Sequence, residues 1–201
     1  MKQSSNSPNI FDRLKTETKE AHINVEEASG AERILDHTIT PQGYQEFLER
    51  NYHAYTEVEQ RVAQFAESPA VTHAQQHPPI STWIAKDLER KLPTTLSEIT
   101  LDNRFECIGA IYVMEGSLLG GALLAKHLDK CTHLAHNGER HFHAANVTER
   151  SKRWKEFKTH VGRLSLSIAN EDDVVLGAQK TFQIFECHFE LSPVPKMEET
   201  V

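Results

Sequence analysis

The stretch Tyr112–Leu128 combines a helical composition with glycines in its middle. It reads YVMEGSLLGGALLAKHL, so Gly116, Gly120 and Gly121 fall at its centre. Each glycine inside a helix costs about 1 kcal/mol relative to alanine, and some other gain must offset that loss. Glycines at these spacings leave a strip of bare backbone on one helix face, where either another helix or a flat ligand can approach the main chain.

Apolar residues recur at spacings of three and four along most of the chain, which is the pattern of amphipathic helices. No segment sustains the alternation of a β-strand, so we expect an all-α fold of about six to eight helices. No linker divides the chain, which indicates one domain over residues 10–191 with flexible ends at 1–9 and 192–201. The expected helices run from about residue 8 to 30, 41 to 67, 80 to 92, 103 to 128, 147 to 169 and 170 to 191.

Local signals predict where several of these helices begin. Thr40-Pro41 and Asp102-Asn103 are typical of helix starts, and Asn170 is the expected cap of the last helix. The polar, histidine-rich residues 130–145 are expected to form an exposed loop.

Charge and composition narrow the class of protein. The formal net charge of -7 argues against a nucleic-acid partner, because phosphate binding needs a basic face. No apolar run approaches the roughly 20 residues that span a bilayer, so we expect a soluble cytoplasmic protein without membrane contact. The three cysteines, Cys107, Cys131 and Cys187, form no CxxC pair and are expected to be reduced thiols.

A polar stripe on the first predicted helix is a candidate binding site. Lys15, Lys19, His22 and Glu26 lie beside the apolar stripe, which places His22 at the border of the core. A neutral imidazole there can ligate a metal, and the lysines can neutralise carboxylates of the same ligand. A boundary histidine taken alone is more often simply packed or hydrogen-bonded.

Two motifs carry a resemblance to a known family. Residues Leu14–His22, continued to Glu26, resemble the proximal helix of haem oxygenases, where the pattern LK-x-x-T-x-x-x-H-x-x-x-E carries the histidine that ligates haem iron. The segment Tyr112–Gly121 resembles the distal helix of that family, particularly of its bacterial branch. Phe182 and Phe189 are similar to an aromatic pair on the last core helix of the family, although both would be ordinary core residues in isolation.

The resemblance implies a haem oxygenase-like helical bundle that holds haem between the proximal and distal helices. The implied reaction opens haem with O2 and reducing equivalents to biliverdin, Fe2+ and CO, so that haem is both cofactor and substrate. A ferredoxin or flavoprotein reductase would supply the electrons, and the protein would be a monomer.

The resemblance also assigns roles to residues. His22 would ligate the iron, and Gly116, Gly120 and Gly121 would lie against the porphyrin face. Lys15 is the best match to the lysine that contacts one propionate in the family, and Lys19 is the second choice. The other propionate would contact a basic surface that includes Arg150, Arg153, Lys155, Lys158 and Arg163, most of which are expected to be solvated.

The sequence departs from the animal members of the family at Ser117, where they have an aspartate. A serine hydroxyl can anchor water but cannot hold a charge, so proton delivery would depend on water, backbone carbonyls or Glu115. We expect Glu115 to point to solvent. Tyr112 could donate a hydrogen bond to the ligand or be packed.

One other function stays open at this point, and a third is weaker. A haem-binding protein for storage, sensing or transfer would lack efficient turnover, and Ser117 motivates that alternative. A di-iron oxidase needs several inward carboxylates with Glu-x-x-His motifs, which these helices do not supply. The histidines His133, His136, His141 and His143 lack the companions of a structural zinc site and are expected to be exposed.

Overall fold

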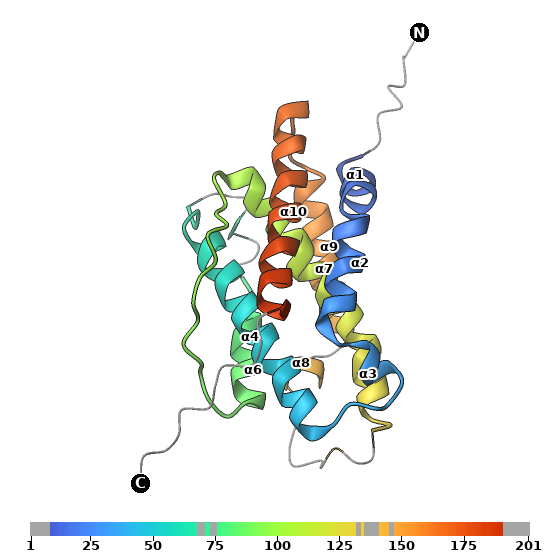
Figure 1. The fold of residues 1–201 in the computed structure, drawn as a ribbon. Helices are drawn as coiled ribbons and strands as arrows, with labels where there is room; N and C mark the ends of the chain where they lie inside the picture. The colour runs from blue at the N-terminus through green and yellow to red at the C-terminus, as the bar shows by residue number, and fades with distance from the viewer. Residues whose placement is uncertain are drawn as a thin grey trace.

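The computed structural model describes residues 9–67, 71–72, 76–131, 134, 141–144 and 147–190. Within these ranges the chain forms helices, turns and loops and no strand, which confirms the predicted all-α fold. Helix α10 (Ile168–Glu190) runs through the middle of the bundle in Figure 1. The predicted flexible ends lie outside the described residues, apart from Asn9.

The first predicted helix is divided in two. Helix α1 (Ile10–Glu17) begins at Asn9, whose side chain accepts hydrogen bonds from the backbone N–H groups of Phe11 and Asp12. Helix α2 (Lys19–Ser29) begins after Thr18, which leaves the helical conformation and donates its hydroxyl to the carbonyl of Leu14 at 2.7 Å. Such back-bonding by threonine competes with the helical ladder. Gly30, in the left-handed region with φ 74°, ends α2 as expected.

The next helices begin where the sequence indicates but end earlier. Thr40 caps helix α4 (Pro41–Ala63), which stops short of residue 67. Helix α6 (Ile80–Asp87) also stops short of the predicted residue 92. A further short helix, α3 (Glu32–Leu35), was not predicted, since its four residues are too few to show a period.

Helix α7 (Arg104–Leu128) begins at its predicted cap, Asn103, and packs along α10. Gly109 and Gly177 allow this close approach, because a Cβ at either position would collide with backbone of the other helix. The expectation that no apolar run reaches membrane-spanning length is wrong for α7, which among the described helices is long and apolar enough to cross a membrane, but 56% of its apolar window is buried in the fold. It is therefore placed as the core helix of the bundle.

Two predictions for the C-terminal half are wrong. The region expected to be an exposed loop contains helix α8 (His141–Ala144) and the buried side chains of Cys131, Leu134 and Phe142. Helix α9 (Val147–Val161) begins at the predicted residue 147 and ends before the predicted residue 169. Helix α10 begins two residues before the expected cap Asn170, whose backbone N–H instead donates to the side chain of Ser167 at 3.2 Å.

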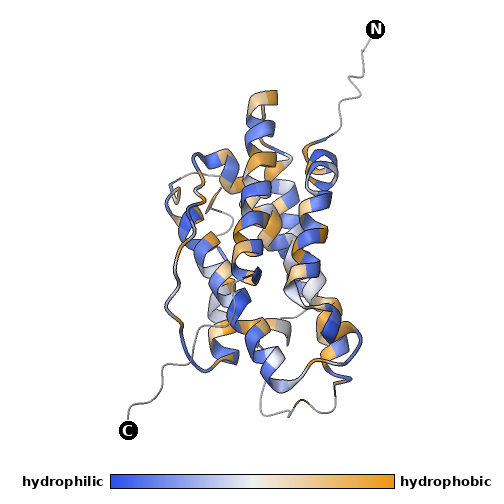
Figure 2. Ribbon diagram, viewed as in Figure 1, coloured by the Kyte–Doolittle hydropathy of each residue, from blue (hydrophilic) through white to orange (hydrophobic). Residues whose placement is uncertain are grey.

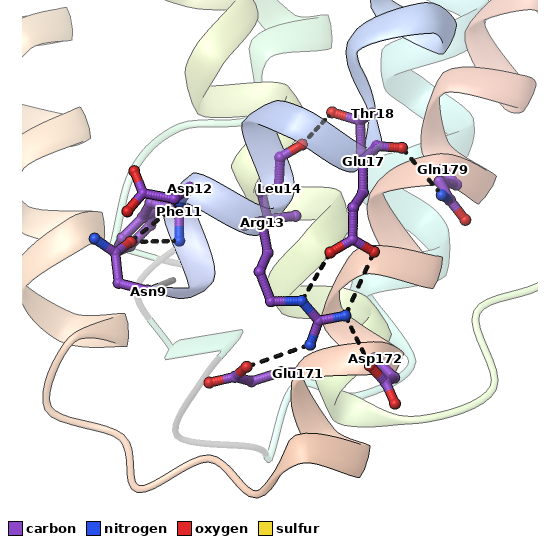
Figure 3. A network of polar contacts seen from close by, with 10 residues as sticks. All are labelled: Asn9, Phe11, Asp12, Arg13, Leu14, Glu17, Thr18, Glu171, Asp172 and Gln179. Carbon is purple, nitrogen blue, oxygen red and sulfur yellow. Dashed lines mark hydrogen bonds and ion pairs between the residues drawn. The ribbon is translucent and has the colours of Figure 1, made fainter. Parts of the chain in front are cut away.

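Polar contacts fix the first helix on the bundle. The Arg13 guanidinium donates to Glu17, to Asp172 at 2.7 Å and to Glu171 at 3.3 Å (Figure 3). Hydrogen bonding to these carboxylates, most strongly to Glu17, raises the pKa of Arg13. Helices α1 and α2 both pack on α10. The outer helices carry hydrophilic and hydrophobic residues side by side, as amphipathic helices do (Figure 2).

Candidate functional site

An open stripe interrupts the buried surface of α7. Gly116, Gly120 and Leu123 follow one another at helical spacing, and Ser117 adjoins them. Ser117 and Gly120 are exposed, and the Leu123 side chain is 53% exposed although it is large and apolar. A Cβ added at Gly116 or Gly120 would meet no described atom within 4 Å beyond its own helix turn. These two glycines therefore leave bare backbone toward open space rather than toward another helix.

Gly121 has a different environment. A Cβ there would lie 2.6 Å from Nη1 of Arg150. The Arg150 side chain is buried and donates to the carbonyls of Leu118, at 2.6 Å, and Phe142. In this structure Gly121 makes room for a buried guanidinium, which is a structural reason for this glycine that the sequence does not show.

His22 lies on α2 with its ring accessible. Its side chain is 57% exposed, and Nδ1 is 3.4 Å from Oε2 of Glu26 one turn later. The ring meets that of Phe182 on α10 edge to face, with centroids 5.7 Å apart. The neighbouring Ile23 is exposed despite its apolar side chain. The accessible imidazole thus has an aromatic support on one side and a carboxylate beside Nδ1.

Aromatic residues on α10 connect the two halves of the candidate site. Phe182 contacts His22, and Phe185, one turn later, contacts Tyr55 of α4 at a centroid distance of 5.0 Å. Phe182 and Phe189 are both buried, and Phe189 packs against Phe185 as a core residue does. The same face of α10 therefore orients the α2 histidine and the α4 tyrosine.

Ser117 is linked to Tyr55 of α4, a residue that was not predicted to belong to the site. The two hydroxyl oxygens are 2.6 Å apart, and Ser117 Oγ is 2.7 Å from the carbonyl of Met114. The carbonyl can only accept, so Ser117 donates to Met114 and accepts from Tyr55. Burial raises the pKa of Tyr55 to about 12, so the phenol keeps its proton. One lone pair of the exposed Ser117 stays available for water.

The expected position of Glu115 is wrong. Its side chain is 2% exposed and pairs with Arg153 of α9, with Nη2 2.6 Å and Nε 3.1 Å from the carboxylate. Arg150 and Arg153 were expected on a basic surface, but both are buried. Burial lowers the pKa of Arg150. A charged side chain at the border of a helix face, such as Glu115, can thus be buried when an oppositely charged side chain from another helix pairs with it.

The other predicted cations remain at the surface. Lys15 and Lys19 are exposed on α1 and α2. Lys158 lies over the ring of Trp154 at 5.5 Å, and Tyr112 contacts the same ring at 5.6 Å. Burial raises the pKa of Tyr112. Tyr112 is therefore packed against α9, one of its two predicted states.

The histidines of the predicted polar loop and the cysteines were not expected to form a metal site. Among the described residues, no group of three or more histidines, cysteines or acids is close enough to hold an ion. His133 and His136 lie outside the described residues, and His141 is half-buried rather than exposed. The thiols of Cys107, Cys131 and Cys187 are not joined in disulfides, and the first two are buried.

Comparison with known proteins identifies the family. The sequence matches the family described as Heme oxygenase over residues 9–92 and 86–190. Among the curated proteins compared, none matches significantly.

Several solved structures share the fold. The NO- and CO-bound heme oxygenase of Neisseria meningitidis is 23% identical with a TM-score of 0.68, covering 97% of this chain and 99% of that one. Heme oxygenase-1 of the cyanobacterium Synechocystis, solved in complex with heme, is 18% identical with a TM-score of 0.70, covering 90% and 91%. The heme oxygenase of Leptospira interrogans is 15% identical with a TM-score of 0.69, covering 90% and 98%. At these identities the likeness establishes the fold.

Proposed function

The chain belongs to the haem oxygenase family and is a haem-degrading enzyme, and we propose that it holds haem between α2 and α7 with His22 as the iron ligand. The single observation that carries this proposal is the bare backbone at Gly116 and Gly120, which faces open space on α7, and the accessible imidazole of His22 on α2 would supply the ligand. The exposed apolar side chains of Ile23 and Leu123 suit a largely apolar ring in the same region.

The described residues fit this ligand. A side chain at Gly116 or Gly120 would fill the space that the open stripe leaves. His22 offers Nε2 to a metal while Glu26 lies beside Nδ1, an arrangement that fixes the tautomer and orientation of a ligating histidine. Lys15 and Lys19, one turn apart, supply positive charge for a propionate. Lys158 is a third surface cation available to the second propionate.

When bound, haem supplies the iron chemistry by which O2 and electrons open its own ring to biliverdin, Fe2+ and CO. The protein residues bind and orient it and control protons. Tyr55 donates to Ser117 and Ser117 donates to Met114, so a water on Ser117 must donate to its remaining lone pair. That water keeps its own lone pairs free, and we propose that it passes protons into the site.

We propose further that electrons come from a soluble ferredoxin or flavoprotein reductase and that the protein works as a cytoplasmic monomer. Lys15, Lys19, Lys155, Lys158 and Arg163 are exposed cations on a chain of net charge -7. A local basic surface on an acidic protein suits an acidic donor and makes electron transfer sensitive to salt.

The test compares wild-type protein with His22→Ala. Wild-type protein should bind one haemin with the absorption of a histidine complex and, with ascorbate in air, form a bilin that absorbs in the red. His22→Ala should lose both, and added imidazole should restore haem ligation. His141→Ala, a histidine remote from α2 in the sequence, is the matched control. Unchanged ligation and turnover in His22→Ala would refute the ligand, whereas haem reduction without bilin in the wild type would refute the proposed reaction.

A further inference from the structure

Two histidines outside the proposed haem site meet where α3 lies beside the C-terminal end of α7 (Figure 1). His37 Nε2 and His127 Nδ1 are 3.1 Å apart, and their ring planes differ by 23°. The ring centres are 5.2 Å apart, so these nitrogens lie between the rings and face each other. One nitrogen must carry a proton and the other a lone pair, since like groups at this distance would repel.

The end of α3 holds His37 in an unusual conformation. Its N–H donates to the carbonyl of Ile34 at 3.3 Å, and that of Thr38 donates to Arg33 at 2.9 Å. This is the Schellman pattern, whose left-handed position is usually glycine. His37 occupies it with φ 64°. A side chain is thus kept at a position where it strains the backbone, and its ring is directed at α7.

A third donor atom lies beside the pair. Leu35 is the last residue of α3, so its carbonyl has no partner within the helix. It lies 2.9 Å from Nδ1 of His127. Two imidazole nitrogens and one carbonyl oxygen therefore gather around a single point between α3 and α7.

We propose that His37 and His127 bind a divalent transition-metal ion such as Zn2+, with the Leu35 carbonyl beside the ion and water in the remaining positions. Neutral imidazole is a good ligand for such ions. Zn–N bonds of about 2.0–2.1 Å at a tetrahedral angle place two nitrogens about 3.3–3.4 Å apart. The observed 3.1 Å is close to that separation. A rotation of the half-buried rings turns both lone pairs from each other toward one ion.

The proton count follows from the hydrogen bond. The ion takes the place of the proton held between the two nitrogens, and that proton moves to the outer nitrogen of the same ring, because a neutral imidazole ligates through one nitrogen and keeps its proton on the other. Two neutral rings therefore bind the ion without net release of a proton. No third histidine, cysteine or acid of the described chain joins the pair. The ion therefore keeps solvent-accessible positions and ties the end of α3 to the end of α7.

The test titrates full-length protein with ZnCl2. Long-range 1H–15N spectra of the imidazole rings should show His37 Nε2 and His127 Nδ1 shifting together, with the ring protons on His37 Nδ1 and His127 Nε2, and calorimetry should show one Zn2+ bound at this site. His37→Asn is the sharpest variant, because asparagine tolerates the left-handed conformation and lacks the imidazole. We expect Zn2+ affinity at this site to fall at least about tenfold, by analogy with losses on altering metal-site residues.

Two further variants guard against misfolding and background binding. His127→Gln removes the other ligand from a different helix and should give the same loss. His141→Ala removes a histidine of the histidine-rich stretch and should leave the joint shift of His37 and His127 intact. The proposal is overturned if Zn2+ moves neither ring in the wild type, or if both ligand variants bind Zn2+ at this step as the wild type does.

Discussion

At the scale of single residues, Gly116 and Gly121 predict opposite effects of the same substitution. A methyl group at Gly116 meets no described neighbour, so Gly116→Ala should raise the free energy of unfolding of the haem-free protein by up to about 1 kcal/mol through helix propensity. The same methyl group would occupy the open stripe and should weaken haem binding and bilin formation. Urea denaturation and haemin titration measure the two effects separately.

Gly121→Ala is the matched control on the same helix. Its methyl group would press against the buried Arg150 guanidinium, so the haem-free protein should lose about 1–3 kcal/mol, as overpacked cores do. If Gly116→Ala destabilised the protein as much as Gly121→Ala, the stripe at Gly116 would be closed and the proposed haem contact there would be wrong.

The buried pair of Glu115 and Arg153 gives a second prediction at this scale. The Glu115 carboxylate is 2% exposed, and Arg153→Met would leave it without an ion-pair partner. Removing one partner of a buried pair lowers the free energy of unfolding by about 3–5 kcal/mol. Lys155→Met changes an exposed lysine on the same helix and should stay within about 0.5 kcal/mol of the wild type. Equal urea midpoints for the two variants would show that the pair does not hold α9 on α7.

The candidate site was predictable where its signal is local in the sequence. His22 and Glu26 form a pattern within one helix, and Gly116, Gly120 and Gly121 lie within four residues of Ser117. Tyr55 and Ser117 are separated by 62 positions, and Glu115 and Arg153 by 38. No periodicity links such residues, because helix packing decides which long side chains meet.

At the scale of elements, the segment between α6 and α7 has no regular structure of its own and depends on Glu57. This α4 carboxylate is fully buried and accepts the N–H and hydroxyl of Ser97, while Arg61 donates to the Ser97 carbonyl at 2.7 Å. His188 Nε2 lies 2.8 Å from the same carboxylate. One buried acid thus joins α4, α10 and the connecting segment.

Ser97→Ala should loosen that segment without unfolding the bundle. It removes a hydroxyl bonded to a charged group, a loss of about 1.5–3 kcal/mol. Amide exchange should accelerate around residue 97 and much less in α7. Thr82→Ala, which removes a hydroxyl that bonds an exposed carbonyl, is the control. Uniform acceleration across all helices would mean that Ser97 stabilises the whole fold instead.

Element boundaries show where sequence reasoning succeeds. Thr40 and Asn103 were expected to cap α4 and α7, and each cap depends on its own side chain and the next few residues. Asn170 is an equally good cap residue, yet α10 begins before it. The side chain of Ser167, which precedes the helix, accepts the backbone N–H of Asn170 and so acts as the cap. The break at Thr18 was not predicted, since threonine is compatible with a continuous helix.

At the scale of the whole molecule, the close crossing of α7 and α10 places titratable groups in a dry core. Cys107, next to the crossing, is fully buried, and so is nearly all of Tyr55. Burial is the main cause that raises the pKa of the Cys107 thiol to about 12 and that of Tyr55 to about 12. Both groups are neutral when protonated, so the fold favours the protonated forms.

These shifts predict a loss of stability at alkaline pH. In the unfolded chain the two groups ionise near their ordinary pKa values of 9.0 and 10.0, while the folded protein retains both protons to about 12. Between the ordinary pKa of each group and about 12, the unfolded chain binds fewer protons than the folded protein, so the free energy of unfolding falls as pH rises. The full contribution is present below pH 9. The loss reaches about 4 kcal/mol for Cys107 and about 3 kcal/mol for Tyr55 by pH 12.

Urea denaturation at pH 7, 9, 10 and 11 measures this loss. Cys107→Ala should be less stable at pH 7 because it leaves a small cavity, but its stability should decline less steeply between pH 9 and 10, before Tyr55 contributes. Cys187→Ala is the comparison, because partial burial and nearby carboxylates raise the pKa of that exposed thiol too, but less than that of Cys107, so the slope should change less than in Cys107→Ala. A decline in Cys107→Ala as steep as in the wild type would mean that the Cys107 thiol ionises in the folded protein as readily as in the unfolded chain.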